Sequence, residues 1–391
     1  MSTTLVGLSP DLLQLLEDGY DIEVRDGNLL VHHVPFVNSE GDVVHGIVVS
    51  ELSTDGERTI QPGRHEVWIV GDVPHDHLGN KISIIADEEP FDYGGGLVAC
   101  CRLSGKPGGQ MPRDYHHKIT NYVSVLGRFA RAVDASATHL DFPLRETSAE
   151  ESVFRYHDAA TSRSGLSAVT EKLKGGRLAI VGLGGTGSYI LDLVAKTPVS
   201  EIHLFDDDVL FAHNAFRAPG AASLEELRES PLKVDYLATT YDAMHRAVTP
   251  HPVRLNEATL HELDAMDFVF LSMDAGPEKK VIIEHLQSRG TSFVDAGMGV
   301  QRMGNSLRGK LRVTAGTPDH YDHIPRRVAY ADVNANEYDW NIQTADLNMM
   351  NAAMAVLKWK KTVGYYVDSK NELNSTYTVA TNQLVSGDLA E

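Results

Sequence analysis

The chain has very few cysteines. Only two occur among its 391 residues, Cys100 and Cys101, and they are adjacent. Adjacent cysteines disfavour a disulfide framework, and a low cysteine content is typical of proteins in a reducing compartment. We therefore expect the protein to be cytoplasmic.

Long apolar runs and an excess of basic charge are also missing. No run approaches the roughly 18 apolar residues needed to span a bilayer. The first residues, Met-Ser-Thr-Thr-Leu, contain no basic segment followed by an apolar one, so no secretory signal is expected. The 35 lysines and arginines are outnumbered by 54 aspartates and glutamates, which gives a formal net charge of −19. This balance argues against nucleic acid or an anionic membrane as the main partner. It leaves open whether the acidity serves solubility alone or attracts a basic protein.

Residues 1–143 have the pattern of a compact, smaller β-rich α+β domain. Short apolar runs alternate there with turn signals such as Asp26-Gly27 and Pro62-Gly63, which is typical of antiparallel strands. Residues Asp114 to Ala132 carry apolar side chains at helical spacing and predict a closing helix. Pro143 and the polar segment Arg145–Glu151 predict a linker.

From residue 152 to 391 the sequence pattern changes to one that predicts alternating strands and helices. A capping box, Ser223 with Glu226, and Pro277 mark two helix starts. This alternation predicts an α/β, Rossmann-like domain, with a mostly parallel sheet and helices on both faces. The expected strands are Leu178–Val181, Ile202–Phe205, Phe268–Ser272, Ser292–Asp295 and a hairpin-like Leu307–Thr314.

The last predicted helix, Ala345–Lys361, carries an apolar stripe. This stripe consists of Leu347, Met350, Met354 and Leu357. We interpret it as core packing, with a dimer seam as the alternative.

A glycine-rich turn follows the first of these strands. Its glycines would let the backbone approach the phosphates of a nucleotide at a helix N-terminus. Asp206 lies 24 residues after Gly182, about where a Rossmann-like unit places the carboxylate that holds a ribose. The glycines alone leave NAD and ATP equally open. They are Gly182, Gly184, Gly185 and Gly187.

The residues after the second strand favour a triphosphate. Asn214, Arg217 and Lys233 follow the carboxylates of Asp206 and Asp208, and arginine and lysine neutralise phosphate charge. Asp274, at the end of a later strand, is a candidate magnesium ligand. Asp208 can alternatively be a capping or structural carboxylate.

The ordered set from Gly182 to Asp274 resembles the ThiF/MoeB-type adenylating enzymes, which include the ubiquitin-activating enzymes. That family has Gly-x-Gly-Gly-x-Gly-Ser, then Asp-x-Asp, then Asn and Arg eight and eleven residues beyond the first Asp. A Pro-x-Lys element, here ending at Lys233, and a strand-terminal Asp follow. The match covers roughly residues 152 to 315.

The resemblance implies ATP- and Mg-dependent adenylation of the C-terminal carboxylate of a ubiquitin-like protein. The four glycines would lie along the nucleotide and Asp206 would bind the ribose. Asn214, Arg217 and Lys233 would contact the phosphates, Arg217 and Lys233 would stabilise the transition state, and Asp274 would bind Mg2+. No structural zinc is expected, because the paired Cys-x-x-Cys elements of several relatives are absent.

Two departures from the family pattern concern the dimer and the acyl acceptor. Homodimeric members often use an arginine before the first strand that reaches the partner's site; Arg155 and Arg163 are the two candidates for this role here. No cysteine follows Gly182. The adenylate is therefore released or passed to another protein, or the thiol comes from Cys100 or Cys101, whose apolar surroundings favour a packing role.

The first domain more loosely resembles the β-rich module that precedes adenylating domains in bacterial ubiquitination-like operons. The resemblance rests on Pro62–Pro74 and on Gly105–Pro107 followed by Tyr115–Lys118. It implies a homodimer whose partners are a ubiquitin-like protein, a conjugating enzyme and a deconjugating protease, in antiphage defence. The alternatives are adenylation of a short peptide or small carboxylate, a nicotinamide-dependent oxidoreductase, and an inactive nucleotide-binding scaffold.

Overall fold

The chain folds as two compact units. A computed structural model describes residues 3–106, 109–141, 147–150, 152–156, 158, 161, 166–330 and 342–389. One unit comprises Met1–Arg145 with Asp158–Gly165, and the other comprises Glu146–His157 with Leu166–Glu391. The predicted linker around Pro143 lies largely outside the described residues. None of the helices in the described ranges has both the length and the apolar character needed to cross a membrane.

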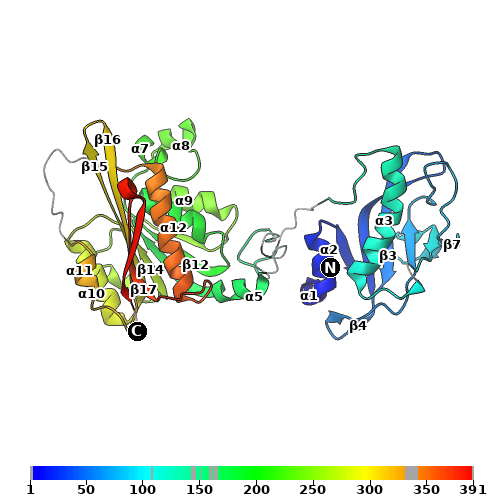
Figure 1. The fold of residues 1–391 in the computed structure, drawn as a ribbon, viewed down its shortest axis with the longest axis horizontal. Helices are drawn as coiled ribbons and strands as arrows, with labels where there is room; N and C mark the ends of the chain where they lie inside the picture. Colours follow the sequence, from blue (N-terminus) through cyan, green and yellow to red (C-terminus); the bar gives the residue numbers. More distant parts are fainter. Residues whose placement is uncertain are drawn as a thin grey trace. The chain divides into compact units, whose positions relative to one another are not determined.

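The N-terminal unit is built on an antiparallel sheet (Figure 1). The strands, in spatial order, are β1 (Ile22–Arg25), β2 (Asn28–Val37), β3 (Val43–Glu51), β6 (Val67–Val70), β10 (Cys101–Leu103) and β7 (Ile85–Asp87). Two small hairpins are β4 (Thr54–Asp55) with β5 (Arg58–Thr59), and β8 (Phe91–Asp92) with β9 (Val98–Ala99). Helices α1 (Thr3–Leu8) and α2 (Pro10–Glu17) precede the sheet, and α3 (Tyr115–Val133) follows it.

Helix α3 confirms the predicted closing helix. Its N-cap is Asp114, whose side chain accepts a hydrogen bond from the backbone N–H of His117 at 2.7 Å, a stabilising arrangement at a helix start. Ile119, Val123 and Leu126 are buried in the core that the helix forms with the sheet. The helical spacing of apolar residues therefore positions this element correctly.

Lys118 of α3 is a buried cation in the N-terminal unit. Its side chain donates a hydrogen bond to Ser50 Oγ at 2.9 Å, and the residue is only 1% exposed. Burial lowers the pKa of Lys118 from its ordinary 10.5 to about 8, because the charged ammonium loses its hydration.

Lys118 should make the stability of the unit depend on pH. Between pH 8 and 10.5 the unfolded chain binds a proton that the folded chain lacks, so the free energy of unfolding should rise with pH. The rise attributable to this residue should be up to about 3 kcal/mol. In urea unfolding at pH 7 to 10.5, Lys118→Met should lose this rise, whereas the exposed Lys81→Met control should keep it. Equal pH slopes for Lys118→Met and the wild type would contradict this account.

The C-terminal unit contains an 8-stranded mixed sheet (Figure 1). Its first five strands in spatial order are parallel, and the last three are added antiparallel. They are β13 (Val248–His251), β12 (Val199–Phe205), β11 (Gly175–Val181), β14 (Phe268–Leu271), β15 (Ser292–Met303), β16 (Ser306–Gly316), β17 (Glu372–Thr378) and β18 (Gln383–Leu389).

Helices cover both faces of this sheet, as the sequence predicts. Leu178 and Ile180 of β11 pack on one face with α6, α9 and α12, whereas Ala179 and Val181 pack on the other with α10. This alternation follows from the period of two in a strand that is buried on both sides. The helices are α5 (Ser167–Thr170), η2 (Glu171–Leu173), α6 (Gly185–Val194), α7 (Ala212–Ala215), α8 (Leu224–Glu229), α9 (Lys233–Asp242), η3 (Leu260–Leu263), α10 (Pro277–Arg289), α11 (Ile324–Arg327), α12 (Ala345–Thr362) and η4 (Val379–Thr381).

The interpretation of the stripe on α12 as core packing is confirmed only in part. Met354 packs against the core, whereas Leu357 is 46% exposed and the buried face includes Ala352, Ala355 and Trp359. The small alanines allow α12 to lie close to α6 and to the sheet. The helix therefore buries a face that includes small side chains, which permits close packing, rather than the whole of the predicted stripe.

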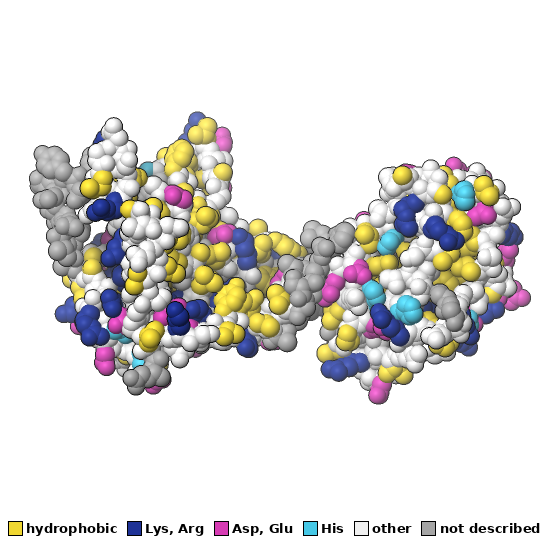
Figure 2. All heavy atoms as spheres, in the orientation of Figure 1, with side chains coloured by type: hydrophobic (Ala, Val, Ile, Leu, Met, Phe, Trp, Pro, Cys, Tyr) yellow, Lys and Arg dark blue, Asp and Glu magenta, His cyan; other side chains and the backbone are white. Residues whose placement is uncertain are grey.

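Charged side chains of both signs are scattered over the surface. On the face drawn in Figure 2, basic and acidic side chains of each unit are interspersed. Such mixing is usual for a globular surface.

Candidate nucleotide-binding site

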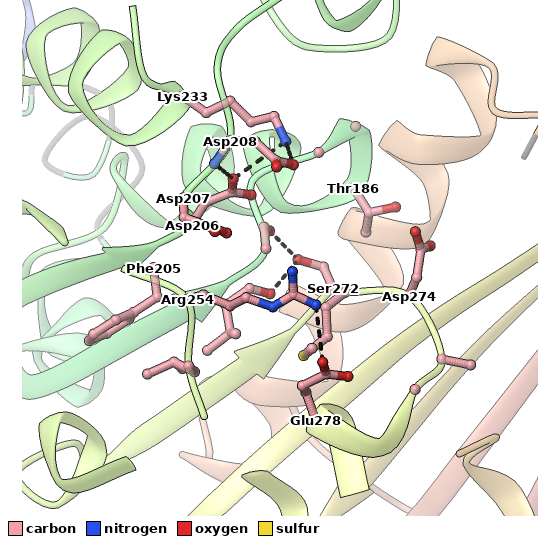
Figure 3. Close-up of a pocket in the computed structure, with 18 of the residues that line it drawn as sticks. Thr186, Phe205, Asp206, Asp207, Asp208, Lys233, Arg254, Ser272, Asp274 and Glu278 are labelled. Carbon is pink, nitrogen blue, oxygen red and sulfur yellow. Dashed lines mark hydrogen bonds and ion pairs between the residues drawn. The ribbon is translucent and has the colours of Figure 1, made fainter. Parts of the chain in front are cut away.

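A pocket of about 390 Å3 lies at the carboxyl ends of β11, β12 and β14 (Figure 3). This is the edge of a parallel sheet where ligands bind in doubly wound folds. The predicted site residues among its lining are Gly182, Gly184, Gly185, Asp206, Asp208, Arg217, Lys233 and Asp274. The volume is within the range of small-molecule sites.

The glycine turn between β11 and α6 is closely packed against its neighbours. Gly182 has a positive φ of 85°, and a Cβ at Gly187 would lie 1.9 Å from the Gly182 carbonyl oxygen. Ser272 Oγ, at the end of β14, donates a hydrogen bond to the same carbonyl at 2.6 Å. Only glycine can therefore occupy position 187 without moving the backbone. The turn directs the N-terminus of α6 toward the pocket, where an anion is favoured.

Asn348 of α12 packs against the glycine turn and forms a hydrogen bond with it. It is fully buried, and its Oδ1 accepts a hydrogen bond from Thr186 Oγ1 at 2.8 Å. A Cβ at Gly185 would lie 2.1 Å from Asn348 Nδ2. Sequence reasoning missed this residue because α12 lies 162 positions away in the chain. The only available signal was a polar residue in the first turn of a predicted helix that carries an apolar stripe.

The two predicted carboxylates after β12 hold Lys233. Lys233 Nζ lies 2.5 Å from Asp208 Oδ2 and 3.4 Å from Asp206 Oδ1 (Figure 3). Asp206 Oδ2 also accepts a hydrogen bond from the backbone N–H of Leu183 in the glycine turn at 2.6 Å. Lys233 is buried, so it is not a solvated surface charge. This ion-pair cluster fixes the second strand to the turn.

Arg217 lines the pocket, whereas Asn214 lies outside its lining. Arg217 Nε is buried and has no hydrogen-bond partner among the described residues. Asn214 Oδ1 accepts a hydrogen bond from the backbone N–H of Phe211 at 2.9 Å and thereby caps α7. The geometry thus favours an anion-binding role for Arg217 and a loop-positioning role for Asn214.

Further polar groups line the pocket that the sequence did not single out. Arg254 Nη2 lies 3.0 Å from Glu278 Oε1 (Figure 3). Arg254 follows β13, a strand that was not predicted, and Glu278 is in the first turn of α10. The pocket therefore combines cations, carboxylates and a close glycine backbone, which fits a ligand that carries phosphates. Asp274 and the cluster Asp206–Asp208 provide oxygen ligands suited to Mg2+.

Cys100 and Cys101 lie in the N-terminal unit and contribute to its packing. Cys101 is fully buried in the core, with Cys100 Sγ 3.7 Å from its sulfur. The hydrogen bond between the thiols and burial raise the pKa of Cys101, and a raised pKa makes a thiol unreactive.

Of the two arginines considered for a dimer contact, Arg155 is engaged within its own chain. Its Nη2 lies 2.6 Å from Asp242 Oδ2. Arg163 lies outside the described residues.

Residues 159–380 match the model of the ThiF family. Residues 10–159 match a domain of unknown function, DUF6791. A search of curated proteins found no match.

Among similar solved structures is the microcin C7 biosynthetic enzyme MccB in complex with N-formylated MccA. It is 17% identical, with coverage of 79% of this chain and 97% of that chain and a TM-score of 0.49. E. coli MccB with ATP is also 17% identical, with coverage of 60% and 70% and a TM-score of 0.45. PaaA is 17% identical, with coverage of 56% and 75% and a TM-score of 0.46. Since the family model spans more than half of the sequence, the chain belongs to the ThiF family.

Proposed function

We propose that the protein is an ATP- and magnesium-dependent adenylyltransferase that activates the C-terminal carboxylate of a ubiquitin-like protein. The observation that carries the proposal is the pocket beside the glycine turn. Arg217 and Lys233 both line this pocket, and Lys233 pairs there with Asp206 and Asp208. A nicotinamide site would not need two cations there. Membership of the ThiF family supports the same chemistry.

In the proposed reaction the substrate carboxylate attacks the α-phosphorus of ATP. A bond from the carboxylate oxygen to phosphorus forms, the bond to the β-phosphate oxygen breaks, and pyrophosphate leaves. Arg217 and Lys233 would stabilise the charge that develops on the phosphates. For this, Lys233 has to exchange its carboxylate partners for phosphate oxygens.

The remaining pocket residues would bind and orient the nucleotide. Gly182, Gly184 and Gly185, which line the pocket, would lie along it, Gly187 would keep the turn compact from outside the lining, and Asp206 would bind the ribose. Asp274 would hold the magnesium ion, which supplies positive charge to the phosphates. Asn214 would position the loop that carries Arg217 rather than bind phosphate directly.

The proposed partners are those that the family resemblance implies for this reaction. We propose a homodimer that acts in the cytoplasm of a bacterium with a ubiquitin-like protein and a conjugating enzyme, in antiphage defence. The exposed apolar side chains on α12, Met349 and Leu357, are candidate dimer contacts. A short peptide presents the same reacting carboxylate, so the substrate assay has to include one.

An ATP–pyrophosphate exchange assay tests the proposed function. The probes are a ubiquitin-like β-grasp protein, the same protein without its last two residues, and a synthetic peptide of its tail. We expect exchange with the intact protein, and a loss of at least about 100-fold in Arg217→Ala and Asp274→Ala. Arg177→Ala, which removes an exposed ion pair with Glu201 on the neighbouring strand β12, should exchange normally.

The assay can contradict the residue roles, the substrate or the reaction separately. Normal exchange in both Arg217→Ala and Asp274→Ala would overturn the residue roles. Exchange with the peptide alone would replace the protein substrate by a peptide. Binding of NAD but not ATP in a thermal-shift assay would overturn the reaction itself.

A further inference from the structure

A serine, a histidine and a glutamate form a chain of polar contacts in the N-terminal unit. His65 Nε2 lies 3.0 Å from Ser104 Oγ, and His65 Nδ1 lies 3.3 Å from Glu66 Oε2. Ser104 is partly exposed, whereas the side chains of His65 and Glu66 are 14% and 19% exposed. This order of hydroxyl, imidazole and carboxylate is the arrangement that activates a serine nucleophile.

Strand pairing brings these residues together. β6 and β10 are antiparallel, with Leu103 opposite Val67. Continuing this register by one and two residues places Ser104 opposite Glu66 and Gly105 opposite His65. The contact thus joins the segment Pro62–Pro74 to Ser104, the residue that directly precedes Gly105; the adenylation chemistry of the C-terminal unit uses neither.

Tyr122 of α3 holds the backbone on both sides of the contact. Its hydroxyl donates a hydrogen bond to the His65 carbonyl oxygen at 2.9 Å and accepts one from the backbone N–H of Gly105 at 2.8 Å. The residue is buried. A helix side chain therefore fixes the separation between the histidine and the segment that bears Ser104, as a preorganised site requires.

The surroundings keep the imidazole neutral and the carboxylate charged. Burial lowers the pKa of His65, with Lys106, Lys118 and Arg102 acting in the same direction and Glu66 opposing them. Burial raises the pKa of Glu66, but a backbone hydrogen bond and the neighbouring charges of Arg102 and Lys118 hold that pKa below its ordinary value. A neutral imidazole that carries its proton on Nδ1, the nitrogen 3.3 Å from Glu66 Oε2, has its Nε2 lone pair available to accept a proton from Ser104.

We propose that Ser104 is a catalytic nucleophile that accepts acyl groups from activated esters and acyl phosphates, with His65 as general base and Glu66 as positioning residue. Ser104 Oγ attacks the carbonyl carbon, its proton passes to His65 Nε2, and an acyl–Oγ ester forms. The bond from the carbonyl carbon to the leaving oxygen breaks, and that oxygen leaves as an alcohol or phosphate after taking up the proton.

An acyl adenylate belongs to this substrate class. In the part of the proposal that rests on the proposed function, Ser104 supplies the acceptor that the C-terminal unit lacks, since no cysteine follows Gly182. The nucleophilic activity itself does not depend on that function, and it can be measured without ATP.

Labelling of the full chain with diisopropyl fluorophosphate, followed by peptide mass spectrometry, tests the proposal. We expect one label per chain, on the peptide that contains Ser104, and a burst of about one equivalent of p-nitrophenol from p-nitrophenyl acetate. Ser104→Ala should abolish both. His65→Gln should slow labelling at least about 100-fold, while Ser136→Ala, which removes an exposed serine, should react like the wild type.

The pH profile separates an activated serine from an ordinary one. The labelling rate should rise with pH until His65 loses its proton, with a midpoint below that of a free imidazole, and then level off, whereas an unassisted hydroxyl reacts faster in proportion to hydroxide. Glu66→Gln should slow labelling and shift this profile. Label on other residues, or equal rates in the wild type and His65→Gln, would overturn the proposal.

A second variant keeps the test valid if His65→Gln folds poorly. Ser104→Cys places a thiol beside the same imidazole, and we expect iodoacetamide to alkylate Cys at this position at pH 6 at least about ten times faster than the thiol of free cysteine. Equal alkylation rates for the two thiols would overturn the role of His65.

Discussion

Gly187→Ala is expected to cost the C-terminal unit about 3 kcal/mol or more of unfolding free energy and to abolish nucleotide binding. The added Cβ would lie 1.9 Å from the Gly182 carbonyl oxygen and 2.6 Å from Ser272 Oγ. The first neighbour is backbone, so the turn itself has to move, and overpacking of this kind is destabilising. Movement of the turn would also displace the N-terminus of α6 from the pocket. Urea unfolding measures the first effect and calorimetric titration with ATP the second.

Gly184→Ala is the matched control for this loop. A Cβ at Gly184 has nothing within 4 Å, and its φ of −69° suits an alanine. Its unfolding free energy should stay within about 0.5 kcal/mol of the wild type. If Gly187→Ala were as stable as Gly184→Ala, the described conformation of the turn would be incorrect.

Asp295→Ala should destabilise the same unit by about 3–5 kcal/mol. Asp295 is fully buried, with Lys279 Nζ 2.9 Å from its Oδ1 and Arg312 paired with its Oδ2. Burial raises the pKa of Asp295, but the charges of Lys279 and Arg312 outweigh this effect and hold that pKa below its ordinary value. Removing the carboxylate would leave two poorly hydrated cations side by side, and breaking a buried ion pair has a cost of this size.

Urea unfolding at pH 7 checks this prediction, with Asp264→Ala as the control. Asp264 also contacts two basic side chains, His285 at 2.8 Å and Arg289 at 3.1 Å, but at the surface. Removal of such an exposed partner should cost less than about 1 kcal/mol. Similar losses in the two variants would mean that burial does not determine the strength of the Asp295 cluster.

The sequence predicts the features that depend on local pattern. The β11 strand, the glycine turn and the capping box at Ser223 are all present, because each depends on residues close together in the chain. The helical stretch after this box is divided into α8 and α9, and α9 ends at Asp242.

Features that depend on distant residues could not be predicted in this way. β13 has a proline and polar residues, and β17 and β18 lack a clear apolar alternation. Their pairing is set by the sheet they join. The support of Gly185 by Asn348 likewise arises only when α12 packs on α6. The spacing that identifies Asn214 in the family does not reveal that its side chain caps α7.

The contact of Lys233 with two carboxylates has a consequence for ligand selection. Its ammonium already has anionic neighbours in Asp206 and Asp208, so an incoming phosphate has to compete with them for it. A neutral nucleoside could enter without disturbing this arrangement. A polyphosphate, in contrast, would leave two negative side chains without their counterion beside its own charge. Tight binding of such a ligand therefore requires that another positive charge enters the cleft together with it.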